Sequence, residues 1–103
     1  EAKLKLNDLK ITVQGDPKIF NCSHELGQGF IVEGENFRLL KGTKYFSHYS
    51  FASVMPFIAA KQRAKDNNDW MKYENDIACP DPKCGAFLRI ERIGERVYEY
   101  GDD

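Results

Sequence analysis

Apolar and polar residues alternate through residues 4–13, and this alternation constrains the fold more than any other feature of the sequence. Leu4 and Leu6 set one phase of the alternation, and the odd-numbered residues of 9–13 set the other. A period of two is typical of a β-strand with one buried face. The apolar phase changes at residues 7–8, where we expect a turn or a β-bulge. This part of the chain therefore predicts strands.

Four further segments have the composition or the alternation of strands. They are residues 30–33, 37–40, 86–93 and 96–100. Gly34 ends the first segment, and residues 94–95 form a predicted turn between the last two. We therefore expect about five or six short strands in a small, mostly antiparallel sheet or partial barrel.

Residues 46–65 have a helical pattern instead. Apolar residues recur at intervals of three and four, which places them on one face of a helix: Phe51, Val54, Met55, Ile58 and Ala59. Pro56 requires that the helix either begins just before it or is kinked there. Ser47 and Ser53 are the candidate N-caps. One main helix that buries this face against the sheet completes the prediction of an α+β fold.

The composition describes one folded domain, residues 1–103, with 42 % hydrophobic residues. The net charge is −1, from 15 basic and 16 acidic residues, so we expect no nucleic-acid partner bound through charge. No apolar stretch approaches the roughly 18 residues of a membrane span, so we expect no membrane partner. Three cysteines form an odd set, which favours a reducing, cytoplasmic location.

Cys22, His24, Cys79 and Cys84 are the residues with the clearest potential for chemistry. Three thiols and one imidazole match the ligands of a tetrahedral zinc or iron site, so a metal site is one hypothesis. In the alternative interpretation, the cysteines are ordinary buried apolar side chains and His24 is exposed. Pro80 and the second proline of this segment stiffen the chain around Cys79 in either case.

Two other kinds of thiol chemistry remain open. Cys79 and Cys84 could form a redox pair, although they lack the Cys-x-x-Cys spacing that lowers a thiol pKa. Cys79 or Cys22 could instead be a nucleophile activated by a histidine, with Asp81 as the orienting acid. The sequence contains no local signature of a thiol enzyme.

Three aromatic or imidazole residues are further candidates. His48 and Tyr49 lie at the predicted start of the helix, where a histidine is either a cap or a residue that faces a ligand. Trp70 is either part of the core or an exposed anchor for a partner.

Several segments resemble a small uncharacterised family of roughly ninety-residue proteins, mainly from anaerobic bacteria and archaea. The segments that carry the resemblance are 10–13, Cys22, 29–32, 50–57, 79–82 and 87–93, so the family-like core is about 10–93. Where the family usually has a cysteine before its helix, this chain has Ser47, and Cys84 is an addition. The resemblance implies the same fold and an anaerobic context, but it implies no reaction.

The hypothesis that covers these observations is a small binding or accessory protein with a Cys/His-lined site that holds zinc, iron or another ligand. A second hypothesis is a non-catalytic small subunit that docks on a larger enzyme, and a third is a thiol-dependent enzyme. A homo-oligomer is the other partner that the strand pattern allows, because unpaired strand edges can associate.

Overall fold

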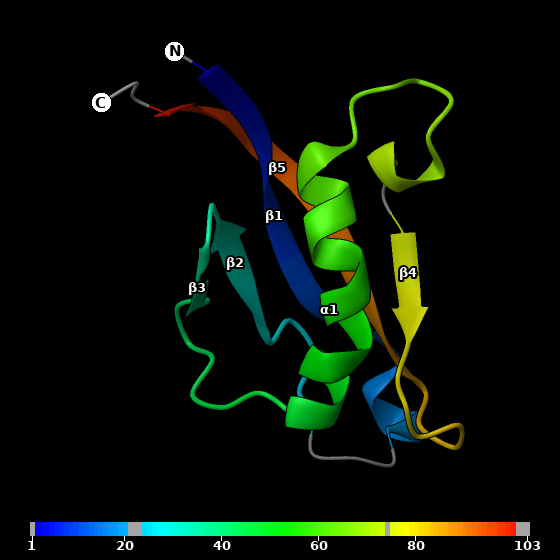
Figure 1. Ribbon diagram of the computed structural model, residues 1–103. Helices are drawn as coiled ribbons and strands as arrows, with labels where there is room; N and C mark the ends of the chain where they lie inside the picture. The colour runs from blue at the N-terminus through cyan, green and yellow to red at the C-terminus, as the bar shows by residue number, and fades with distance from the viewer. Residues whose placement is uncertain (1, 21–23, 74, 101–103) are drawn as a thin grey trace.

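The computed structural model describes residues 2–20, 24–73 and 75–100 of the chain. Its elements, in order, are β1 (Ala2–Gly15), the 3₁₀ turn η1 (Pro17–Ile19), β2 (Gly29–Glu33), β3 (Asn36–Leu39), α1 (His48–Arg63), the 3₁₀ turn η2 (Trp70–Lys72), β4 (Asn75–Ala78) and β5 (Ala86–Tyr100). The strands form one unclosed antiparallel sheet in the order β3-β2-β1-β5-β4, and α1 lies across one face of it (Figure 1). The predicted α+β fold is confirmed.

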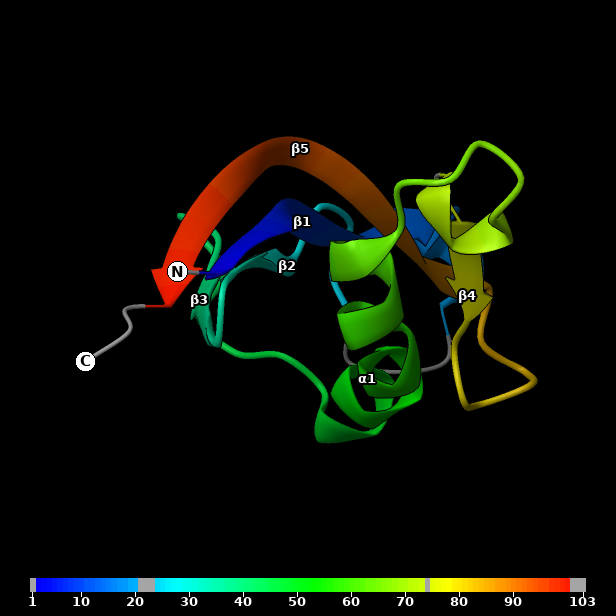
Figure 2. The same cartoon turned by 45° about the horizontal axis from the view of Figure 1, so that its top comes forward.

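β1 and β5 form the long central ribbon of the sheet. Asp8 pairs with Gly94, whereas Leu9 pairs with Arg92, so Ile93 is an extra residue on β5. The predicted irregularity at residues 7–8 is thus confirmed as a β-bulge. β5 continues through the bulge and bends over the sheet, as Figure 2 shows.

The predicted turn at residues 94–95 is therefore wrong, and residues 96–100 do not return as a separate strand. The physical reason is the length of β1, whose 14 residues offer pairing partners to both halves of β5. Gly94 is paired with Asp8 next to the bulge, and a glycine inside a continuous strand often marks such an irregularity.

The core lies between α1 and the middle of the sheet. Its fully buried side chains come from both: Leu9, Ile11, Val13, Phe30, Val54, Leu88 and Ile90. The odd-numbered residues of 9–13 pack in this core, as the alternation predicts. In the part of the chain that the structure describes, no helix combines the length and the apolar composition needed to cross a membrane.

The predicted buried face of α1 is only partly right. Val54 and Ile58 are buried, but Met55 is 42 % exposed. The buried stripe instead consists of Ser50, Val54, Ile58, Lys61 and Gln62. The apolar pattern placed the stripe wrongly because three of its members are polar residues whose hydrogen bonds are satisfied inside the protein.

The start of α1 is capped as the sequence suggests. The Ser47 side chain accepts a hydrogen bond from the backbone N–H of Ser50, so Ser47 rather than Ser53 is the N-cap. Pro56 lies inside α1, which continues from His48 to Arg63 on both sides of it. Pro56 is exposed, so its ring meets solvent rather than the core.

Candidate functional site

The η1 segment, which precedes Cys22, and the loop that follows Cys79 lie next to each other. Their adjacency is visible in described residues: the backbone N–H of Gly85 donates to the carbonyl of Ile19 at 3.1 Å. A Cβ atom on Gly85 would lie 2.2 Å from Ile19 Cγ1, so a larger residue here would require the Ile19 side chain to move. The segment before Cys22 and the loop after Cys79 are thus held together.

A cavity of about 370 Å³ opens beside this contact, at the N-terminal end of α1. Three segments line it: one contributes His24, the start of α1 contributes Ser47, Tyr49 and Ser50, and the loop after β4 contributes Cys79, Pro80 and Asp81. Figure 1 shows the corresponding end of α1 beside the loop that follows β4. The cavity therefore brings His24 and Cys79 to one surface, although 54 residues separate them in the sequence.

His24 is a buried side chain with polar contacts on both ring nitrogens. Its Nε2 lies 2.6 Å from Ser50 Oγ, and its Nδ1 lies 3.4 Å from Gln28 Oε1. The ring also contacts Phe46, with 5.7 Å between centroids. Only 7 % of His24 is exposed, so the expectation that His24 could be exposed does not hold.

These contacts assign the tautomer of His24. Gln28 Oε1 also accepts a hydrogen bond from the backbone N–H of Glu25, at 3.4 Å, and a backbone N–H can only donate. With that oxygen facing the ring, Nδ1 carries the proton and donates to Gln28. Nε2 then accepts a hydrogen bond from the Ser50 hydroxyl. Ser50, His24 and Gln28 form one hydrogen-bonded chain at the wall of the cavity.

Sequence reasoning missed Ser50 and Gln28. Ser50 is 1 % exposed and lies four residues before Val54 in the buried stripe of α1. A hydroxyl at a buried position of a helix needs a partner, and this polar residue in the stripe is the signal that could have identified it. No comparable sequence signal distinguishes Gln28, because it lies between two glycines in a pattern that predicts a turn.

The loop that carries Cys79 and Asp81 contains a hydrogen-bonded β-turn. The backbone N–H of Lys83 donates to Asp81 Oδ1 at 2.9 Å, and that of Cys84 donates to the Asp81 carbonyl at 3.0 Å. Pro82 occupies the second position of this turn, where its fixed φ is favourable. The loop therefore presents Cys79 and Asp81 to the cavity from a stiff backbone.

The remaining predicted residues are distributed differently. Cys22 lies outside the described residues. Cys84 is half-buried against the core, and the described lining of the cavity does not include it. Tyr49 lines the cavity and stacks on the exposed His48, with 4.1 Å between centroids. Trp70 is 57 % exposed and lies beside Phe57, away from the described cavity lining.

The described residues contain no group of three or more His, Cys, Asp or Glu side chains arranged to hold a metal ion. Comparison with protein-family models, curated proteins and solved structures finds no match to the chain. The fold and the cavity thus define the class: a small α+β protein with a pocket lined by thiol, imidazole and hydroxyl groups.

Proposed function

We propose that the protein is a small binding protein whose cavity at the N-terminal end of α1 takes up a compact organic ligand. One observation carries the proposal: His24, Ser50 and Cys79 come from three separate segments and line the same cavity. Convergent polar side chains in a largely apolar concave site are typical of ligand-binding pockets.

The size of the cavity supports an organic molecule rather than a bare ion. Its 370 Å³ falls within the range of roughly 300–1,000 Å³ that is usual for small-molecule sites. Tyr49 and Pro80 supply apolar surface, whereas His24, Ser50 and Asp81 supply groups that orient a polar ligand. The N-terminal end of α1 adds a partial positive charge that favours an anionic group on the ligand.

Zinc or iron is the alternative occupant of the cavity. Cys79 would supply a thiolate, and metal affinity would then fall in acid because the thiol must lose its proton. His24 would have to exchange its hydrogen bond with Ser50 for a metal bond, since both ring nitrogens are engaged. This exchange is the cost that distinguishes metal binding from binding of an organic molecule.

The test is a two-dimensional NMR screen of a fragment library, with zinc chloride as a separate probe. We expect compact polar fragments to shift the resonances of His24 and Tyr49 and to lose binding in the Cys79→Ala variant. Cys84→Ala and His48→Ala are matched controls, because the described lining of the cavity includes neither residue. Absence of any fragment or zinc response at the cavity would overturn the proposal.

A second candidate function is acyl transfer, and the 2.6 Å contact between Ser50 Oγ and His24 Nε2 favours it. In this reaction Ser50 Oγ attacks an ester carbonyl while His24 Nε2 takes the hydroxyl proton. His24 then returns that proton to the departing alcohol, and water hydrolyses the acyl-serine. Gln28 holds the ring in the required tautomer.

Hydrolysis of p-nitrophenyl acetate tests this candidate. We expect Ser50→Ala to abolish turnover and Ser53→Ala to leave it unchanged, because Ser53 bonds only the Ser50 carbonyl among described contacts. If Cys79→Ala rather than Ser50→Ala abolishes turnover, the enzyme uses a thiol instead. If the wild-type protein hydrolyses the ester no faster than the Ser50→Ala variant and buffer do, both the serine mechanism and the thiol mechanism are refuted.

A further inference from the structure

The β3 edge of the sheet is an unprotected strand. β3 is the outermost strand, and all four of its residues are exposed. Two of them are large apolar side chains, Phe37 at 55 % and Leu39 at 39 % exposure. The β4 edge differs, because its described residues contain no large apolar side chain of comparable exposure. An exposed apolar edge strand is a template for pairing with another strand.

The hydrogen-bonding direction of β3 follows from its register with β2. A two-residue turn that begins with Gly34, at φ +62°, joins the strands and makes Glu33 and Asn36 the closing pair. The backbone N–H of Leu40 donates to Gly29 at 2.9 Å, so even-numbered residues direct their backbone groups toward β2. The odd-numbered Phe37 and Leu39 therefore direct theirs toward the open edge.

The sequence around β3 is complementary to itself in the antiparallel direction. In an antiparallel pair centred on Arg38, Phe37 lies opposite Leu39 of a second copy. Glu35 and Lys41, in the turns that flank β3, then come near each other across the two copies. In this register Phe37 and Leu39 form the hydrogen-bonded pairs, which is what their outward backbone groups require. One twofold arrangement thus satisfies the backbone, the apolar pair and the charge pair together.

We propose that two copies of this chain associate through β3 in this register, forming a continuous sheet with five strands from each copy. The twofold axis passes perpendicular to the sheet at Arg38, so both helices lie on the same face. This inference is independent of the ligand cavity at the other side of α1.

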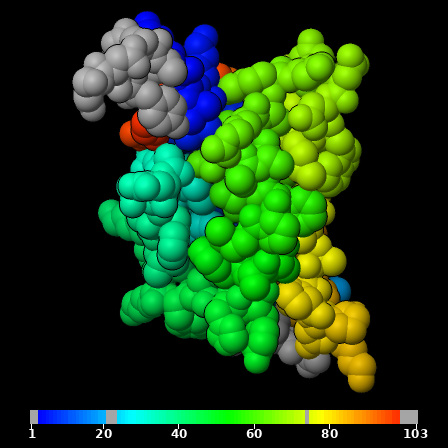
Figure 3. All heavy atoms as spheres, in the orientation of Figure 1, coloured from blue at the N-terminus to red at the C-terminus, as the bar shows by residue number. Residues whose placement is uncertain are grey.

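The helix-facing surface of the hairpin fits this arrangement. Phe37 lies on the α1 side, with its ring centroid 4.9 Å from that of Phe51. A groove of about 230 Å³ runs between α1 and the hairpin, and Phe37, Phe51 and Met55 are among its apolar residues. Figure 3 shows the β2–β3 hairpin and α1 side by side on this face. Leu39 of the second copy would lie beside Phe37 at this groove and remove apolar surface from water.

The register also has one unfavourable contact, which is Arg38 opposite Arg38 of the second copy. Like charges directly opposite each other destabilise a strand pair. Each Arg38 already forms an ion pair with Glu33 of its own copy, with 3.3 Å between Nε and Oε1. That carboxylate, which also pairs with Arg96, offsets part of the repulsion, so the arginine pair weakens the dimer.

Charge exchange tests the register directly. In Glu35→Lys or Lys41→Glu, both opposite-charge pairs of the dimer become like-charge pairs, so we expect the dimer Kd to rise on the order of tenfold. The double variant restores both pairs, and so does a one-to-one mixture of the single variants. Sedimentation velocity of the full chain measures each Kd, and added salt weakens the wild-type dimer.

A backbone variant tests the strand pairing itself. Leu39→Pro removes an N–H that points away from β2, so the monomer keeps its own ladder while the dimer loses two hydrogen bonds, one per copy. Circular dichroism checks that the variant folds. A wild-type chain that sediments as a monomer at its highest soluble concentration would overturn the proposal. So would a dimer that none of these substitutions weakens, because its interface must then lie elsewhere.

Discussion

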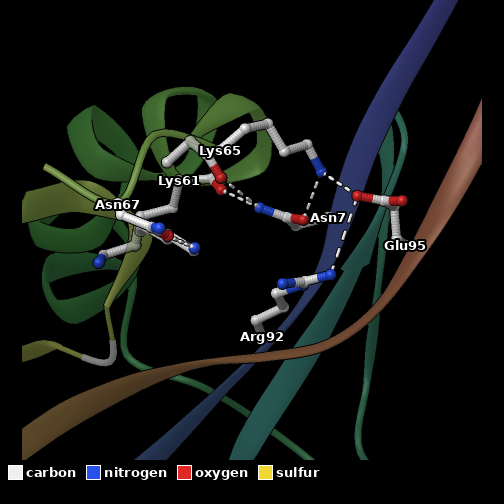
Figure 4. A network of polar contacts seen from close by, with 8 residues as sticks. Asn7, Lys61, Lys65, Asn67, Arg92 and Glu95 are labelled. Carbon is white, nitrogen blue, oxygen red and sulfur yellow. Dashed lines mark hydrogen bonds and ion pairs between the residues drawn. The ribbon is translucent and has the colours of Figure 1, made fainter. Parts of the chain in front are cut away.

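The two ends of α1 both carry buried polar side chains, but they use them differently. At the C-terminal end, Asn7 Nδ2 donates to the carbonyls of Lys61 and Ala64 at 2.8 and 3.2 Å. The last carbonyls of a helix have no partner within it, so Asn7 satisfies groups that would otherwise be orphaned (Figure 4). Gln62 Nε2 donates to the Gly34 carbonyl at 2.8 Å and ties the same end to the β2–β3 turn.

Lys61 completes this end of the helix. Its ammonium donates to the Tyr73 carbonyl at 2.9 Å and lies 5.4 Å from the centroid of the Trp70 ring. Burial lowers the pKa of Lys61, while the charge of Asp69 opposes that shift. These side chains bond to backbone carbonyls and contact one another, so the polar groups at this end of α1 stabilise the fold.

At the N-terminal end, Ser50, His24 and Gln28 bond in a chain of side chains, and the first two of them line a cavity. A helix can be capped more simply, as Ser47 already does here. The contact between Ser50 and His24 joins two side chains and satisfies no backbone group of the helix. The comparison teaches that burial of a polar group is not itself evidence of function; what matters is whether its partners are backbone groups or other side chains at an opening.

We expect the largest effect from a substitution that destabilises the middle of α1, because the geometry of both ends depends on it. Ile58→Ala should lower the free energy of unfolding by about 2–5 kcal/mol, because Ile58 is buried in the core. Both ends of α1 should then lose their geometry, so fragment binding at the cavity should weaken as stability falls. Met55→Ala is the matched control and should cost less, since Met55 is partly exposed. Urea unfolding of the two variants checks the contrast; equal losses would contradict it.

A change at the C-terminal end should separate stability from binding. Asn7→Leu leaves the carbonyls of Lys61 and Ala64 without this donor, so we expect a loss of about 1–3 kcal/mol in the free energy of unfolding. Ligand binding at the distant cavity should be unchanged. Denaturant unfolding and the fragment screen measure the two effects. Asn68→Leu, at an exposed position, should change neither.

Changes at the N-terminal end should affect binding as well as stability. Ser50→Ala alone leaves His24 Nε2 without its hydrogen-bond partner and should cost about 1–3 kcal/mol. The double variant Ser50→Ala with His24→Phe replaces both partners by apolar groups and should recover most of that loss. Binding at the cavity should be lost in both variants. A double variant that is less stable than either single variant would show that the pair serves the fold instead.

The fold could be predicted from the sequence because alternation and helical spacing report directly on burial. Leu9, Ile11 and Val13 pack in the core as their period requires, and the bulge next to residues 7–8 follows from the phase change. The continuation of β5 past Gly94 could not be predicted, because glycine serves both turns and bulges and the choice depends on the pairing partner. The buried stripe of α1 could not be predicted for a related reason. Ser50, Lys61 and Gln62 can be buried because their hydrogen-bond partners lie elsewhere in the sequence.

The site was predictable only in part. His24, Cys79 and Asp81 were identified by residue type, and the structure places all three at one cavity. Ser50 and Gln28 could not be found this way, since serine and glutamine are common surface residues and only the fold gives them a histidine partner. The roles of Cys22 in a metal site and of Trp70 as an anchor stay predictions.

The smallest expected effect concerns charge at the C-terminal end. Lys65 donates hydrogen bonds to both Asn7 and Glu95 (Figure 4). The hydrogen bond to Glu95 holds the pKa of that carboxyl group below its usual value near 4.5. A carboxyl group with a lowered pKa in the folded state contributes stability above its unfolded pKa, and that contribution is lost as the pH falls through the folded pKa. The wild-type chain should therefore lose stability more steeply below pH 4.5 than Lys65→Met. Unfolding curves at successive pH values measure the difference in slope. The same series on Ser53→Ala should parallel the wild type, because Ser53, near the other end of α1, bonds only the Ser50 carbonyl among the described contacts. Parallel slopes for wild type and Lys65→Met would instead place the acid-sensitive groups away from this end of the helix.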